Sequence, residues 1–165
     1  MRFHLVVAAA LLLSLSVPAS AQEWTQYVSK EDRFTGNFPG QPTVTQTTYS
    51  SQYDAELPAR VYSARRGNGR YSMTVVDYGP WRLDFHGAIV YATWRFLQRD
   101  AKVTELAWNT TGSVGGNQIH LTNRDGSRTM AAVYMHTQKL YIIEGTVPKG
   151  EPAPPRGDPP GEIRN

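Results

Sequence analysis

The sequence contains no cysteine and is not rich in charge. Without a thiol the chain cannot form a disulfide, use a cysteine nucleophile, or hold zinc or an iron–sulfur cluster through sulfur ligands. Charged residues make up 19% of the chain and hydrophobic residues 40%, which is typical of a globular protein rather than a disordered or membrane-embedded one. The fold must therefore depend on its hydrophobic core.

Long apolar runs are missing too, with one exception at the N-terminus. The run from Leu5 to Val17 is interrupted only by two serines, follows Arg2, and leads to an Ala-Ser-Ala site at Ala21. These features predict a signal peptide over residues 1–21, and the run is shorter than the roughly 20 residues that cross a bilayer. We therefore expect no membrane span, and a mature chain of 144 residues that is periplasmic or secreted after cleavage near Ala21.

A strong charge of one sign is also absent. With Arg2 assigned to the signal peptide, 16 basic residues stand against 14 acidic ones, a net charge of +2. The arginines are spread over different predicted elements, whereas a protein that tracks phosphates needs a concentrated basic stripe. We therefore do not expect nucleic acid as a partner.

Motifs that identify enzymes or cofactor sites do not occur. The chain has no Gly-x-Ser-x-Gly, Ser-x-x-Lys or His-Glu-x-x-His sequence, and its glycine-rich segments 67–69 and 112–116 match neither a dinucleotide fingerprint nor a phosphate loop. The carboxylates that could still converge as a pair for glycoside hydrolysis are Asp77, Asp84, Glu105 and Glu144, although their spacing singles out no pair. We predict no catalytic residue and no cofactor.

The histidines do not predict a metal site. Outside the signal peptide only His86, His120 and His136 remain. In the strand pairing described below, His120 lies opposite Met130, six residues and about 20 Å from His136. Two histidines at that separation cannot bind one ion, so we expect no metal.

Two turn signals predict hairpins in the first half of the sheet and in the second. Asn68-Gly69 separates β-type runs at 57–66 and 70–78, which predicts a two-residue turn with Arg60 opposite Asp77. Asp125-Gly126 fits a three-residue loop with Gly126 in a left-handed bulge, because this pairing collects the aliphatic side chains on one face.

The next turn, Thr137-Gln138, pairs Val133 with Ile142 and completes three adjacent antiparallel strands. The last of these strands, residues 140–143, is apolar on both faces, so we expect both faces of the sheet to be covered.

One segment carries a helical pattern. Phe85, Ile89, Ala92 and Phe96 recur at helical spacing, which predicts an amphipathic helix from Asp84 to about Arg99. Further strands are predicted at 24–28, 34–38, 43–52 and 103–108. The order favours an α+β fold over residues 22–147, a mainly antiparallel sheet built from hairpins and packed against this helix.

The C-terminal segment has a different composition. Six prolines fall within residues 148–165, where apolar residues are almost absent. Such a segment cannot bury enough surface to offset the entropy of ordering it. We expect a disordered tail.

Three residues are candidates for binding: Trp81, Asp77 and Arg60. Trp81 lies in the connection before the predicted helix, and binding residues are frequent in connections. Asp77 and Arg60 form either a structural cross-strand ion pair or part of a pocket wall.

A resemblance covers about residues 24–147. Trp24-Thr25-Gln26-Tyr27, followed by Phe34 to Pro42 with the pattern Phe-x-x-x-Phe-Pro-Gly-x-Pro, resembles the opening of a group of uncharacterised exported bacterial proteins. Those proteins are similar in fold to the PsbP-like α/β/α sandwich of the extrinsic photosystem II subunit. The resemblance implies a fold but no functional residues. Because the tail has no amphipathic stretch, the second face of the sheet is either less covered or covered by a partner.

Two functions remain open from the sequence. The leading hypothesis is an exported soluble accessory or protein-interaction domain without catalytic activity, with a protein partner in the cell envelope. The alternative is a periplasmic small-ligand-binding protein or a hydrolase of unrecognised type that uses Asp77, Arg60 and Trp81.

Overall fold

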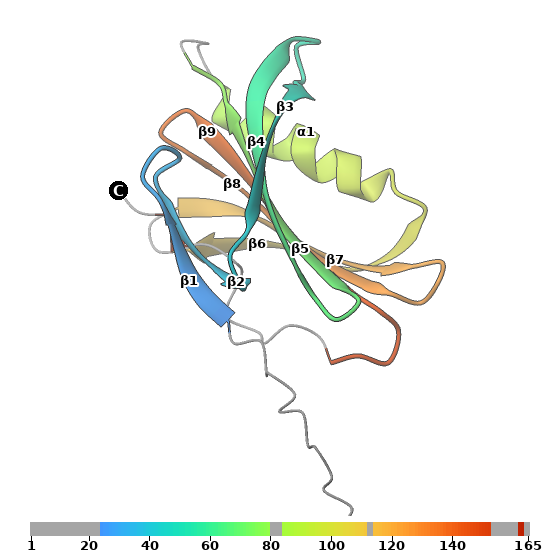
Figure 1. Ribbon diagram of the computed structural model, residues 1–165. Helices are drawn as coiled ribbons and strands as arrows, with labels where there is room; N and C mark the ends of the chain where they lie inside the picture. Colours follow the sequence, from blue (N-terminus) through green and yellow to red (C-terminus); the bar gives the residue numbers. More distant parts are fainter. Residues whose placement is uncertain (1–23, 80–83, 112–113, 153–161, 164–165) are drawn as a thin grey trace, which may run out of the picture.

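The main element of the fold is a seven-stranded antiparallel sheet in the order β3-β4-β5-β9-β8-β7-β6 (Figure 1). The computed structural model describes residues 24–79, 84–111, 114–152 and 162–163. The strands are β3 (Thr43–Ser50), β4 (Glu56–Arg66), β5 (Gly69–Asp77), β6 (Ala101–Thr111), β7 (Val114–Asn123), β8 (Arg128–His136) and β9 (Lys139–Val147). This arrangement, with one helix, confirms the predicted α+β class.

The two faces of this sheet are covered by different elements. Helix α1 (Phe85–Leu97) packs on one side, here called the helix face. A hairpin of β1 (Trp24–Ser29) and β2 (Phe34–Pro39) packs on the other, here called the hairpin face. Both faces are therefore covered, as the apolar strand at 140–143 predicts. The second cover is a β hairpin of the same chain, so the expectation that this face is less covered or covered by a partner is wrong.

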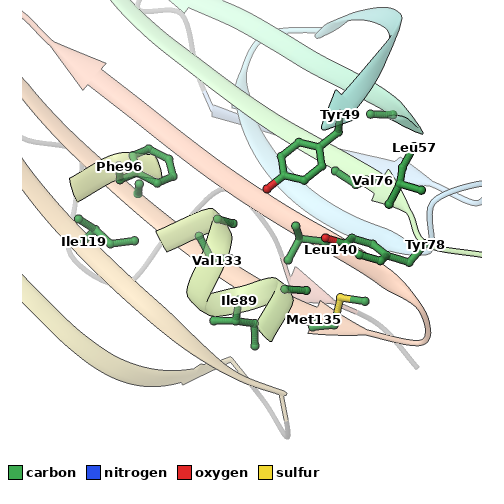
Figure 2. Packing of buried hydrophobic residues seen from close by; sticks show 14 of the residues in the cluster. Tyr49, Leu57, Val76, Tyr78, Ile89, Phe96, Ile119, Val133, Met135 and Leu140 are labelled. Carbon is green, nitrogen blue, oxygen red and sulfur yellow. The ribbon is translucent and has the colours of Figure 1, made fainter. Parts of the chain in front are cut away.

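The helix face holds the larger core cluster. Ile89 and Phe96 of α1 lie against Ile119 and Val133 of the sheet (Figure 2). Three residues of the predicted stripe, Ile89, Ala92 and Phe96, are buried, together with Ala88, whereas the fourth, Phe85, is 48% exposed at the first position of the helix. Asp84 caps the helix, since its carboxylate accepts the Gly87 amide N–H at 2.9 Å.

The second half of the sheet has the predicted pairing. Gly126 has a φ of +79° in the loop between β7 and β8, and Ile119 lies opposite Ala131. The turn between β8 and β9 has positive φ at both Thr137 and Gln138, which is the geometry of a type I′ turn. Val133 therefore lies opposite Ile142, as predicted.

The predicted pairing of β4 with β5 is wrong by two residues. The turn is Gly67-Asn68 rather than Asn68-Gly69, so Arg60 lies opposite Val75 and not opposite Asp77. Gly67 has a φ of +55°, which suits the first position of a type II′ turn. A shift of two residues leaves every side chain on the same face, so the hydrophobic pattern could not distinguish the two registers.

Some predictions concern segments at the edge of the described residues. A short strand, β10 (Glu162–Ile163), pairs antiparallel with β2 inside the segment where we expected a disordered tail. The rest of that tail from residue 153 and the predicted signal peptide lie outside the described residues. In the described part of the chain, no helix is both long enough and apolar enough to cross a membrane.

Candidate functional site

A buried carboxylate lies where the β1–β2 hairpin meets the main sheet. Asp32 belongs to the four-residue turn between Ser29 and Phe34, and its side chain is 0% exposed. Within this turn the hydroxyl of Ser29 accepts the backbone N–H of Asp32 at 3.1 Å. The turn also contains Arg33, whose φ is +54°. The local backbone thus directs Asp32 toward the hairpin face.

The carboxylate of Asp32 is fully used by donors from two strands of the main sheet. Arg60 of β4 binds both oxygens, through Nε at 2.7 Å and through Nη2. The hydroxyl of Tyr62 donates at 2.6 Å and the ammonium of Lys139, on β9, at 3.0 Å. A bidentate arginine with two further donors is a strong way to hold a buried carboxylate.

These contacts shift the pKa values of the cluster away from neutrality. Burial raises the pKa of Asp32, but the hydrogen bonds from Arg60, Tyr62 and Lys139 outweigh it and lower the pKa to about 2. Burial and the hydrogen bond to Asp32 raise the pKa of Tyr62 to about 12. Burial also raises the pKa of Tyr141 to about 12. At pH 7 the carboxylate of Asp32 is therefore ionised and the hydroxyls of Tyr62 and Tyr141 are protonated, far from the pKa near 7 that suits an acid–base catalyst best.

Further contacts extend the cluster to its surroundings. The hydroxyl of Tyr141 donates to the backbone carbonyl of Asp32 at 2.8 Å. On the outer side, Arg60 binds the exposed Glu31 at 2.6 Å, and Lys139 lies 3.5 Å from Asp77. The cluster ties the hairpin turn to β4, β5 and β9.

The structure does not bring together Arg60 and Asp77, two of the three residues that the sequence suggests for binding. Arg60 and Asp77 do not pair with each other; Lys139 and Asp32 lie between them. Asp77 instead accepts the Gly79 amide N–H at 2.8 Å and its side chain is 48% exposed. Trp81 lies outside the described residues.

The cluster also contains residues that sequence reasoning missed, Asp32 and Lys139 foremost. Asp32 lies in the run Lys30 to Arg33, four charged residues between two strands, which is typical of a solvated turn. Tyr62 and Tyr141 are buried, and an apolar strand pattern does not reveal that their hydroxyls bind Asp32. The one local signal is Ser29, directly before this four-residue turn, because a serine hydroxyl can accept the backbone N–H of the residue three positions later and so fix the turn.

The other carboxylates considered for hydrolysis are each bound to a separate partner. Glu105 lies 2.8 Å from His120, Glu144 binds Arg99 through both oxygens, and Asp84 caps α1. Asp77 and Glu144 lie on opposite faces of the sheet. Ile143 and its cross-strand partner Met73 are buried on the hairpin face; Asp77 is four residues from Met73 and shares this face, whereas Glu144 follows Ile143 directly and lies on the helix face. In the described ranges there is no group of three or more histidines and carboxylates that could hold a metal ion.

The second notable feature is the edge strand β6. Eleven residues long, it pairs only with β7 among the described strands. Leu106 and Trp108 are 50% and 56% exposed, and both lie on the helix face, because Leu106 is opposite the buried Ile119. The Trp108 ring lies directly on Gly115 of β7, where an added Cβ would come within 2.5 Å of it.

Comparison with protein-family models and with curated proteins found no match for this chain. The comparisons supply no family.

Proposed function

We propose that this chain is an exported accessory domain that binds a protein of the cell envelope and catalyses no reaction itself. The observation that carries the proposal is the open edge of β6, with its two half-exposed apolar side chains. Proteins usually protect such edges with charges, prolines or covering elements, because an unpaired strand pairs readily with another chain. An extended segment of a partner can add to such an edge as a further strand.

The other edge of the sheet provides a contrast. Strand β3 is also exposed, but its outer residues are mostly threonine and glutamine, with Val44 as its one large exposed apolar side chain. Pro42 precedes it and the strand is shorter. The partner proposed for β6 is therefore an extended segment with apolar side chains at alternate positions, which would contact Leu106 and Trp108.

The non-catalytic part of the proposal is supported by the Asp32 cluster. Its carboxylate has no exposed surface and its donors are all engaged, so it offers no group to a substrate. We also propose export by a signal peptide over residues 1–21 and a PsbP-like fold over residues 24–147. The antiparallel sheet with one covering helix supports the second, with a hairpin in the place of another helical layer.

The test places a photoreactive phenylalanine derivative at position 106 or, as the matched control, at Val44 on the other edge. We expect irradiation of cells that export the protein to yield one adduct of defined mass from position 106 and none from position 44. Adding Trp108→Lys to the first variant should abolish the adduct. Equal labelling from both edges, no adduct from position 106, or an adduct of twice the chain mass would each contradict the proposal.

A further inference from the structure

A polar cleft of about 680 Å³ lies away from both features described above. It is formed by β4, β5 and β9, the start of β3, and the residues that link β2 to β3. Helix α1 packs on β7, β8 and β9 and reaches the 57–59 end of β4. The opposite end of β4 and β5, around Arg65 and Arg70, is exposed. The cleft therefore lies where the sheet extends beyond the helix.

The strand register arranges the floor of the cleft in two polar rows. The first row crosses four strands through residues that lie opposite one another, namely Thr43, Ser63, Ser72 and Glu144. All of them are on the helix face, since their chain neighbours Tyr62, Met73 and Ile143 are buried on the hairpin face. The second row lies two residues further along each strand, on the same face.

That second row contains two arginines side by side. Arg65 lies directly opposite Arg70, and Thr146 of β9 follows in the same row. Like charges directly opposite each other in a sheet are destabilising. Within the described residues no carboxylate forms an ion pair with either arginine. The arrangement therefore holds positive charge that an anion would stabilise.

The acidic residues near the cleft do not cancel this charge. Glu144 is bound through both oxygens by Arg99, at 2.7 and 2.9 Å, so its charge is already compensated. Hydrogen bonds from Ser127 lower the pKa of the exposed Asp125, and Arg70 adds only a smaller effect from a distance. Two guanidinium groups thus remain available above a floor of hydroxyls.

We propose that this cleft binds a small acidic carbohydrate, a sugar that carries a carboxylate or a phosphate. Arg65 and Arg70 would hold the anionic group, because guanidinium groups match the planar, bidentate geometry of carboxylates and the oxygens of phosphates. The hydroxyls of Thr43, Ser63 and Ser72 can donate to and accept from sugar hydroxyls. The volume falls within the usual range for small-molecule sites, and the polar lining disfavours an apolar ligand.

The site is independent of the β6 edge and goes beyond the proposed protein-binding function. It also differs from the pocket predicted around Asp77, Arg60 and Trp81, since neither Asp77 nor Arg60 lines it.

The test is an NMR titration of the ¹⁵N-labelled mature protein with four probes: galacturonate, glucose 6-phosphate, glucose and inorganic phosphate. We expect saturable shifts at the amides of Ser63, Arg65, Arg70 and Ser72 with one or both acidic sugars. Galacturonate alone would identify a carboxylate ligand, and glucose 6-phosphate alone a phosphorylated one. Glucose and inorganic phosphate should bind at least tenfold more weakly, and added salt should weaken the acidic sugars.

Variants separate binding from folding. Arg65→Ala and Arg70→Ala should each weaken binding at least tenfold while the thermal midpoint stays equal or rises, because a like-charge pair is removed. Arg66→Ala is the matched control, since Arg66 is an exposed arginine on the same strand that faces the other side. The proposal fails if no acidic sugar gives saturable shifts, if glucose or inorganic phosphate binds equally well, or if Arg66→Ala weakens binding as much.

Discussion

The buried Asp32 makes a sharp prediction about stability. The perturbation is Asp32→Asn, which keeps the shape of the side chain and removes its charge. In the folded protein the carboxylate compensates Arg60 and Lys139, and the Lys139 side chain is only 13% exposed. The substitution therefore leaves a nearly buried cation without its main partner and places an amide N–H₂ among donors.

The magnitude follows from the pKa and from the cost of an unpaired charge. A fall from the ordinary value of 3.8 to about 2 corresponds to about 2.5 kcal/mol of stability at neutral pH. Removing one partner of a buried pair usually costs about 3–5 kcal/mol, because the other charge stays buried. We expect Asp32→Asn to lower the free energy of unfolding by about 3–5 kcal/mol, or the urea midpoint by roughly 2 M.

The pH dependence has a definite sign. Since the pKa of Asp32 is lower in the folded state, its contribution is complete above about pH 5 and is lost as the pH falls through 4 toward 2. Urea unfolding of the wild-type protein should show this loss, and the Asp32→Asn curve should be flatter by about 2.5 kcal/mol over the same range.

The control is Glu31→Gln, which removes the other carboxylate bound to Arg60. Glu31 is 70% exposed, so its loss should cost less than about 1 kcal/mol. If Asp32→Asn is too unstable to study, the double variant with Lys139→Met should recover part of the loss by removing the uncompensated cation. An Asp32→Asn protein within 1 kcal/mol of wild type, or with an unchanged acid profile, would refute the reasoning.

Two further substitutions test the packing and the turn. Phe96→Ala removes a ring that is 3% exposed between α1 and the sheet, so we expect a loss of about 3–5 kcal/mol in urea unfolding, whereas Trp94→Ala on the 50% exposed side of α1 should cost far less. Gly67→Ala should cost about 1 kcal/mol because Gly67 has a φ of +55°, while Asn68→Ala should cost less because Asn68 has no positive φ. The reverse order would contradict the observed turn.

Much of the fold could be predicted because local chemistry and the hydrophobic pattern agree. The Gly126 bulge fixes a register that also gathers the aliphatic side chains of β7 and β8, so two independent signals select one pairing. In the β4–β5 hairpin the hydrophobic pattern fits two registers that differ by two residues. The register is then set by the turn, in which Gly67 takes the position of positive φ. The proposed anion site in the cleft depends on this register, because Arg65 lies opposite Arg70 only in the observed pairing.

The Asp32 cluster could not be predicted for a different reason. Its members come from the β1–β2 turn, β4 and β9, and the contacts between Asp32 and Lys139 span 107 positions of the chain. Sequence spacing shows which residues share a strand face, but it does not show where a separate hairpin docks on that face. A charged turn is usually solvated, so the burial of one of its carboxylates becomes visible only in the structure.

The order of the sheet separates the two proposed sites. The cleft is lined by β3, β4, β5 and β9, whereas the open edge is β6, with β8 and β7 between β9 and β6. At about 4.8 Å per strand, Glu144 on β9 and the axis of β6 are about 14 Å apart. Substitutions at such a distance usually act additively. Loss of Arg65 should therefore leave β6 competent to pair, and loss of Leu106 should leave the cleft intact, so each proposal stands or falls on its own measurement.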